Sequence, residues 1–248
     1  GSTTSPCPTD NLYRIIGVID NKVKLIKYDY ATSTLLGKDG DYYGSSTPGS
    51  TYKGSQSSID RYYWNYKASG NASNVWSTSL LNKTNLNTNF INKIGSTWAG
   101  KIATTTWQVG GNTFAKISEV VPATAYKNEV GSSASRTIVN KKIGLMYVSD
   151  YYYAASPSAW TLVGYNSSDS TKDYRAATGD NWMYMGYLDW TISRNSDDSN
   201  YAFIVNYDGY VSYDNVSNGN GVRPSFNLES TVAYVSGSGS MSDPIRVS

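Results

Sequence analysis

The chain has 248 residues, a formal net charge of +2 and no histidine. The near-neutral charge gives no strong field for binding nucleic acid, and the absence of imidazole excludes histidine-based catalytic triads and removes the commonest zinc ligand. No stretch of the sequence is apolar and long enough to span a bilayer.

Residues 1–10 (GSTTSPCPTD) are typical of a flexible tail. The leading Gly1-Ser2 is typical of a cloning remnant, so we expect any native signal peptide or membrane anchor to have preceded it. Cys7 is the single cysteine, which excludes an intrachain disulfide. We expect it to be an inert thiol in the tail, with a link to a partner chain as the alternative. Residues 11–248 show no repeat and no linker, and we predict one domain.

The domain begins with two strand patterns, at 12–19 and 22–27, on either side of Asp20-Asn21. In the second pattern Lys alternates with Val and Leu, as in a strand with one wet face. We therefore predict an N-terminal hairpin. The segment 31–58 is rich in Gly, Ser, Thr and Tyr and is predicted as loop. A short aromatic strand or buried turn is predicted at 61–66.

The most helical pattern follows Trp76, where apolar residues recur at helical spacing. We predict two short helices, near 75–82 and 85–94, whose apolar faces pack on the sheet. Gly95 is a natural stop for the second helix. We expect the helices of the domain to lie before Gly111.

The middle of the chain is predicted as strand and loop. Strand patterns occupy 104–109 and 143–149, and the second is an unbroken apolar run typical of a buried strand. The segment 115–129 is ambiguous because Pro122 limits any helix there. Residues 160–179 are polar and are predicted as a long loop.

The C-terminal third returns to strand patterns, at 183–186, 190–193 and 221–228. A last hairpin is predicted from 231–235 and 245–247. It would close the fold by pairing with the N-terminal hairpin, so the two ends of the domain are expected to lie near each other.

A further hairpin is predicted where 201–207 and 210–216 flank Asp208-Gly209. A two-residue Asp-Gly connection favours a type I′ turn, which would place Tyr207 opposite Tyr210. Neither face of this hairpin is cleanly apolar, so the alternation of apolar and polar residues does not indicate which face is exposed to solvent.

The region between Lys172 and Glu229 contains no Lys, no Glu and no Gln, although Lys is frequent before it. One explanation is an extracellular loop region rich in Ser, Asn and Gly. The other is the genetic code: an AAC codon with randomised adenines can become Asn, Tyr, Asp, Ser, Gly or Ile. It cannot become Lys, Glu or Gln, whose codons end in a purine.

The same narrow set of residues suits a binding surface. Tyr supplies large, stiff contact area at low entropy cost, and Ser, Gly and Asn supply adaptable hydrogen bonds. We predict ligand-binding residues at Asn195, Asp198, Asn200, Tyr201, Ile204, Asn206, Tyr207, Asp208, Tyr213, Asp214, Asn215, Ser217, Asn218 and Asn220.

The remaining residues of this stretch are predicted as framework. Arg194 and Arg223 are expected to brace loops through hydrogen bonds to carbonyls or a carboxylate. The apolar framework positions are Trp182, Trp190, Phe203, Val205, Val211, Val222, Pro224, Phe226 and Leu228.

Two other kinds of site were weighed. Asn195, Asp197, Asp198 and Asn200 carry oxygens that calcium accepts, although no EF-hand spacing is present. A carboxylate pair for glycoside hydrolysis could come from Asp180, Asp189, Asp208 and Asp214. Neither reading is favoured, and we expect no metal, no cofactor and no enzyme activity.

Three motifs together, Trp76-Ser-Thr-Ser-Leu-Leu, Asp189-Trp-Thr-Ile-Ser-Arg and Gly221-Val-Arg-Pro-Ser-Phe-Asn-Leu, resemble a family of gut-bacterial, pilin-like surface proteins. That family resembles the branch of the C-type-lectin fold that contains formylglycine-generating enzymes and the variable proteins of diversity-generating retroelements. The resemblance covers the chain from about Leu12 onward. One departure is that the enzymes of this branch rely on paired cysteines, whereas this chain has only Cys7.

The resemblance implies an α+β, C-type-lectin-like fold with a mixed, mostly antiparallel sheet, two short helices and long loops. It implies a bacterial cell-surface protein, an adhesin or receptor-binder, that displays a variable face to a protein or glycan on another cell, phage or host. We expect the chain to be monomeric, to bind no nucleic acid, and to reach a membrane only through a preceding anchor. The alternatives are a structural pilin or surface-layer subunit and a calcium-dependent glycan-binding lectin.

Overall fold

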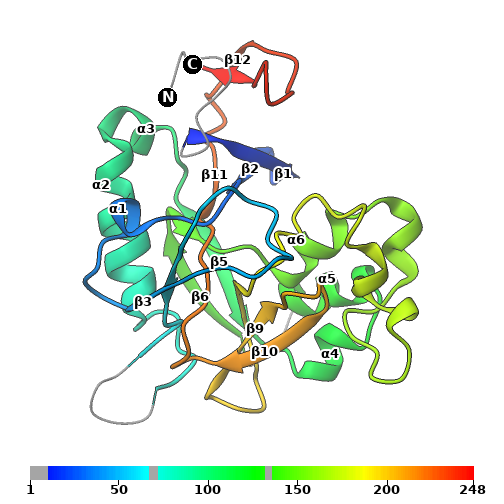
Figure 1. Ribbon diagram of the computed structural model, residues 1–248. Helices are drawn as coiled ribbons and strands as arrows, with labels where there is room; N and C mark the ends of the chain where they lie inside the picture. The colour runs from blue at the N-terminus through cyan, green and yellow to red at the C-terminus, as the bar shows by residue number, and fades with distance from the viewer. Residues whose placement is uncertain (1–10, 67–71, 132–135) are drawn as a thin grey trace.

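The computed structural model describes residues 11–66, 72–131 and 136–248 (Figure 1). It is a mixed α+β structure whose paired strands all run antiparallel in small sheets. The predicted tail of residues 1–10, including Cys7, lies outside the described residues. In the part of the chain that is described, no helix has the length and hydrophobicity needed to cross a membrane.

A four-stranded sheet joins the two ends of the domain. Its order is β1-β2-β11-β7, from β1 (Tyr13–Ile19), β2 (Lys22–Lys27), β11 (Ser225–Asn227) and β7 (Ile143–Gly144). Asp20 and Asn21 have φ of 49° and 59°, the left-handed pair that a two-residue type I′ turn requires. The N-terminal hairpin is thus confirmed, and β11 brings the C-terminal part of the chain against it.

A second sheet, of order β10-β9-β8, separates two apolar cores. It contains β8 (Asp189–Arg194), β9 (Tyr201–Val205) and β10 (Val211–Asn215). Ala202 and Ile204 pack into one core, while Phe203 and Val205 pack into the other. Because both faces of β9 are covered, its sequence shows no clean alternation between apolar and polar residues.

The β9–β10 hairpin exists, but its register differs by one residue from the prediction. Val205 pairs with Val211, and the Asn206 N–H donates to the Tyr210 carbonyl at 2.8 Å, so the loop has three residues. Gly209 has φ of 92°, which fits a three-residue turn ending in the left-handed region. The slip places Tyr213 opposite Phe203, whereas the predicted pairing of Tyr207 with Tyr210 would place it opposite Ile204.

The remaining strands form three two-stranded antiparallel sheets. They are β3 (Tyr42–Ser46) with β4 (Ile59–Tyr62), β5 (Thr105–Gly110) with β6 (Arg136–Lys141), and β12 (Tyr234–Ser236) with β13 (Arg246–Val247). The C-terminal one, β12 with β13, confirms the predicted C-terminal hairpin. The C-terminal hairpin pairs only with itself in the described chain, so β11 and not this hairpin contacts β2. The predicted strand at 183–186 is irregular backbone.

The two helices predicted near 75–82 and 85–94 are one continuous helix that starts later. It consists of a π-helical part, η2 (Leu81–Phe90), and α2 (Ile91–Ile94), and it ends at Gly95 with φ of 83°. The buried Asp41 carboxylate accepts the Leu81 N–H at 2.7 Å and fixes the start. Short helices flank it in the sequence, α1 (Ser33–Leu36) before it and α3 (Ser96–Gly100) after it.

The prediction that helices lie only before Gly111 is wrong. Three follow it: α4 (Phe114–Ser118), α5 (Pro122–Val130) and α6 (Val148–Tyr153). Pro122 begins α5, where the missing N–H has no cost. Only β7 remains of the strand predicted at 143–149, because the buried Glu129 carboxylate accepts the N–H groups of Val148 and Ser149 and starts a helix there. A short buried apolar run does not distinguish strand from helix.

The predicted loop 160–179 contains only single turns of 3-10 helix. These are η3 (Pro157–Thr161), η4 (Ser170–Lys172) and η5 (Tyr174–Ala177). In the described residues after Trp160 no long helix occurs, as expected. Of the predicted apolar framework, Trp182 is half-buried and the other eight residues are buried.

Candidate ligand-binding face

The fourteen predicted contact residues divide by exposure. Four are buried and are removed from the predicted face: Asn195, Ile204, Asn206 and Asn220. Five are half-buried: Asp198, Tyr201, Asp214, Asn215 and Ser217. Five are exposed: Asn200, Tyr207, Asp208, Tyr213 and Asn218. β9 and β10, which carry or flank most of them, lie along the lower edge of the molecule in Figure 1, with α4 beside β10.

An unbroken row of five aromatic rings crosses this edge. Tyr201 contacts Tyr213 with ring centroids 5.1 Å apart, and Tyr213 meets Phe114 of α4 edge-on at 5.2 Å. The row continues from Phe114 to Tyr165 at 6.0 Å and from Tyr165 to Tyr210 at 5.0 Å. Tyr213 is 42% exposed, so the row is accessible at its middle. Large, rigid rings with polar tips are the residues that dominate recognition surfaces.

One end of the row is held by a cation. The Arg175 guanidinium lies 5.5 Å from the Tyr165 ring centroid and 5.3 Å from that of Tyr210. The buried Asp173 carboxylate accepts hydrogen bonds from Nε and Nη2 of this guanidinium, and that hydrogen bonding raises the pKa of Arg175 above its ordinary value. Burial raises the pKa of Tyr210 as well. The tip of the hairpin beyond it is open, since Tyr207 is 50% exposed.

The 195–201 loop is held by a residue outside the predicted stretch. The buried Asn74 side-chain amide donates to the carbonyls of Asn195 at 2.6 Å, Tyr201 at 2.7 Å and Asp198 at 3.0 Å. Arg194 donates to the Asn74 Oδ1 at 3.2 Å, which confirms the bracing role predicted for it. The loop backbone is therefore fixed while Asn200 stays exposed.

The 214–220 loop is held by its own side chains. The Asp214 carboxylate accepts from the side-chain amides of Asn218 at 2.7 Å and of the buried Asn220 at 2.9 Å. The Asn215 Oδ1 accepts from both the N–H and the hydroxyl of Ser217, as in an Asx turn. Val216 is fully buried in the core and anchors the middle of the loop, so the exposed polar atoms around it are pre-arranged.

A second aromatic cluster borders this loop and was missed by sequence reasoning. Tyr63 stacks on Tyr66 with centroids 4.4 Å apart and meets Tyr43 edge-on at 5.0 Å. A Cβ at Gly219 would lie 2.3 Å from the Tyr43 ring, so only glycine allows this approach. The periodicity of 61–66 gave no indication that Tyr63 and Tyr66 are surface residues. Phe114 and Tyr165 were missed too, because no spacing connects them with β10.

Two of the oxygens considered for calcium already accept hydrogen bonds from the loop backbone. Asn195 Oδ1 accepts the Asp197 N–H, and Asp198 Oδ1 accepts the Asn200 N–H. Across the residues that the structure describes, no group of three or more His, Cys, Asp or Glu side chains could hold a metal ion. The loop is thus arranged as a hydrogen-bonded turn.

The carboxylates considered for glycoside hydrolysis have different surroundings. Asp189 is buried in an ion pair with Arg223, so Arg223 is also a bracing residue, as predicted. Asp214 binds the amides of its own loop. Asp208 is exposed at the hairpin tip, and Asp180 is exposed at the end of the 174–180 turn.

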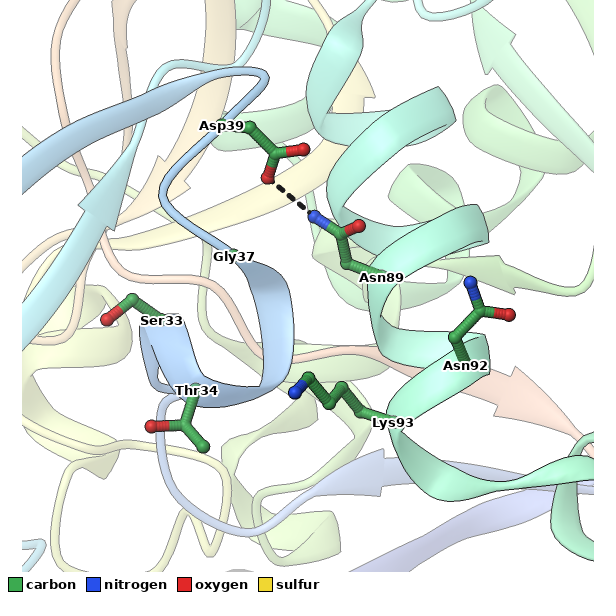
Figure 2. Close-up of a pocket in the computed structure, with 7 residues that line it drawn as sticks. All are labelled: Ser33, Thr34, Gly37, Asp39, Asn89, Asn92 and Lys93. Carbon is green, nitrogen blue, oxygen red and sulfur yellow. Dashed lines mark hydrogen bonds between the residues drawn. The ribbon is translucent and has the colours of Figure 1, made fainter.

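A polar hollow of about 420 Å³ lies elsewhere, between α1 and the helix 81–94 (Figure 2). Asn89 donates to the Asp39 carboxylate at 2.7 Å across it and to the Leu36 carbonyl at 2.8 Å. These bonds tie the 36–39 turn to the helix, so the hollow is the seam between two elements. Its lining consists of Ser33, Thr34, Gly37, Asp39, Asn89, Asn92 and Lys93.

Comparison of the chain with models of protein families, with curated proteins and with solved structures gives no match.

The bracing of the 195–201 loop leads to a prediction. Asn74→Ala removes the side-chain donor from the Asn195 carbonyl and one of two donors from the carbonyls of Tyr201 and Asp198. We expect the free energy of unfolding to fall by about 1–3 kcal/mol. Asn200→Ala, in the same loop but exposed, is the matched control and should change it by less than about 0.5 kcal/mol. Urea unfolding measures both, and hydrogen exchange should show faster exchange of the 195–201 amides only in Asn74→Ala. Equal costs for the two variants would contradict the bracing role.

Proposed function

We propose that the protein is a recognition protein that binds a macromolecular ligand through the lower edge of β9 and β10. The supporting observation is that one stretch of sequence, 182–230, supplies residues both to the buried cores and to the exposed surface. Its apolar residues enter both cores, while Asn200, Tyr207, Asp208, Tyr213 and Asn218 are exposed along one edge. Braced loops reduce the entropy lost on binding, which favours affinity.

The proposal extends to how the face is generated. The exposed residues belong to the set that randomised adenines of AAC codons produce, and the stretch lacks Lys, Glu and Gln. We propose that a retroelement diversifies this face on a bacterial cell-surface protein, with a scaffold similar to the C-type-lectin fold. The observed α+β class with small antiparallel sheets is compatible with that scaffold.

The nucleotide sequence tests the diversification. Codons for Asn200, Tyr207, Asp208, Tyr213 and Asn218 should all end in C, while codons for the buried framework should show no such rule. A near-copy of the 190–223 coding region, differing only at adenines, should lie beside a reverse-transcriptase gene. Codons ending in T at several of the exposed positions would contradict the mechanism but leave the binding role open.

The binding role has its own test. A library restricted to Asn, Tyr, Asp, Ser and Gly at the five exposed positions is displayed and selected against panels of bacterial, phage and host surface proteins and glycans. We expect different sequences to be enriched by different targets at unchanged melting temperature. A library of the same size at exposed positions of β6, such as Thr137, Ile138 and Asn140, is the control and should yield no binders.

The two alternatives predict different results. A structural pilin or surface-layer subunit would use the tyrosine row against copies of itself, so its elution volume should fall as concentration rises. A calcium-dependent lectin should melt at a higher temperature with calcium than with chelator. We expect a concentration-independent monomer and no calcium shift.

A further inference from the structure

A groove of about 310 Å³ lies between β1 and the corner formed by α5 and α6. Its β1 wall lies in the upper half of Figure 1, away from the β9–β10 edge. Its walls are apolar or aromatic and its floor is polar. The lining residues are Ile16 and Ile19 of β1, Tyr126 of α5, and Ser149, Asp150 and Tyr153 of α6.

The floor carries an acceptor oxygen with spare capacity. Asp150 is 8% exposed, and its Oδ2 accepts from the Tyr147 N–H at 2.7 Å and from the Lys24 ammonium at 2.5 Å. Its Oδ1 has no hydrogen bond to any residue that the structure describes. Glu129, also buried, accepts the N–H of the adjacent Ser149. Asp150 therefore lies at the floor of the groove and Glu129 behind it, and the Lys24 ammonium pairs with Asp150.

The same carboxylate already binds one cation in an aromatic setting. The Lys24 ammonium, on the inner side of Asp150, lies 4.7 Å from the Tyr147 ring centroid and 5.6 Å from that of Trp107. On the outer side, Tyr126 and Tyr153 meet at an interplanar angle of 74° and are 46% and 38% exposed. Two rings at an angle beside a carboxylate form a setting that attracts an ammonium or guanidinium group.

β1 is the edge of its sheet, and no strand of the described chain pairs with its outer side. Val18 is 69% exposed and Ile15 47% exposed, with no proline in the strand. An unprotected apolar edge strand is a template for adding an extended segment.

We propose that β1 and this groove form a docking site for an extended peptide segment of a partner protein, with one lysine or arginine side chain inserted between Tyr126 and Tyr153 toward Asp150. Backbone pairing with β1 supplies affinity, and the groove supplies selectivity for a basic side chain. The site is independent of the face on β9 and β10, so either proposal can fail alone.

Binding of labelled peptides tests the proposal by fluorescence anisotropy. One probe is a nine-residue peptide of alternating threonine and valine with a central lysine, and the other has norleucine in place of that lysine. We expect the lysine peptide to bind about tenfold more tightly, a preference that added salt reduces. Equal affinities, or no binding at millimolar protein, would overturn the proposal.

Substitutions in the groove and changes to the peptide backbone distinguish selectivity for the basic side chain from pairing along β1. Tyr153→Leu keeps an apolar wall but removes a ring, and should lower the lysine preference several-fold without changing affinity for the norleucine peptide. Tyr66→Leu removes a tyrosine that is equally exposed (39%, against 38% for Tyr153) but lies outside the groove, and it should change neither affinity. N-methylation of alternate peptide bonds should abolish binding of both peptides. If n-butylamine bound as tightly as the lysine peptide, docking along β1 would be excluded.

Discussion

Alanine at Phe203 is expected to lower the free energy of unfolding by about 3–5 kcal/mol, because a fully buried ring leaves a cavity. Alanine at Trp190 or Phe226, which are also buried, should lower the free energy of unfolding by a similar amount. Half of the Tyr207 surface is exposed, and its ring is in no aromatic pair of the described chain. Alanine at Tyr207 should therefore change the free energy of unfolding by less than about 0.5 kcal/mol.

The matched pair for this test is Phe203 and Tyr213. They lie directly opposite each other in the β9–β10 ladder, so position along the chain cannot explain a difference between them. Tyr213→Ala loses two edge-on ring contacts and should cost about 1 kcal/mol. Urea unfolding of these variants, and of swaps among Asn, Tyr, Asp and Ser at Asn200 and Asn218, measures the contrast.

The outcome bears on the proposed function. If the exposed positions tolerate exchange while the rings beside them do not, the stretch combines a fixed framework with a variable surface. If Tyr207, Asn200 and Asn218 prove as costly as Phe203, they are network residues. The β9–β10 hairpin would then be an ordinary structural element, and the binding face would lose its main physical support.

Local chemistry allowed part of the fold to be predicted. Asp20-Asn21 adopts left-handed backbone where a type I′ turn was expected, and Gly95 ends a helix as expected, because both depend on one or two residues. The α+β class and the terminal hairpins follow from similar local patterns. The hairpin at Asp208-Gly209 shows the limit, since Gly209 serves a three-residue loop equally well and the register then shifts by one.

The features of the fold and of the site that were not predicted depend on contacts between residues distant in the sequence. The helix α6 begins where Glu129, about twenty residues earlier, accepts the first N–H groups, and no pattern within 143–149 contains that information. Asn195, Asn206 and Asn220 belong to the polar set and were placed on the surface, but they are buried. The same limit applies to Asn74, which reaches the 195–201 loop from more than a hundred residues away.

The buried pair of Asp189 and Arg223 is expected to be as costly to break as the core rings. The guanidinium Nε donates to the Asp189 Oδ2 at 2.6 Å. Nη2 lies 2.6 Å from the same oxygen in the ion pair and donates to the Met183 carbonyl at 2.8 Å. Each side chain is about 3% exposed or less. Arg223→Met leaves a buried carboxylate unpaired, so unfolding should become easier by about 3–5 kcal/mol at neutral pH. The exposed pair of Lys172 and Asp169 is the control, and Lys172→Met should cost under about 1 kcal/mol.

This pair also predicts a dependence on pH. Burial raises the pKa of Asp189 to about 6, although Arg223 opposes the rise. The unfolded value is about 3.9, so the folded protein holds an extra proton between these two pKa values. The contribution of Asp189 to the free energy of unfolding is therefore largest below about pH 4, falls as pH rises toward 6, and is constant above. A shift of that size corresponds to about 1–3 kcal/mol.

Comparison with Asp189→Asn isolates this contribution. Asp41 and Glu129, whose pKa values burial also raises, titrate in both proteins and cancel in the difference. Between pH 4 and 6.5 the wild-type chain should lose stability relative to Asp189→Asn, measured by urea unfolding at each pH. A constant difference would mean that Asp189 stays ionised over this range. In that case Arg223 would outweigh the burial of the carboxylate, and the pair would contribute more to stability at neutral pH than its buried position indicates.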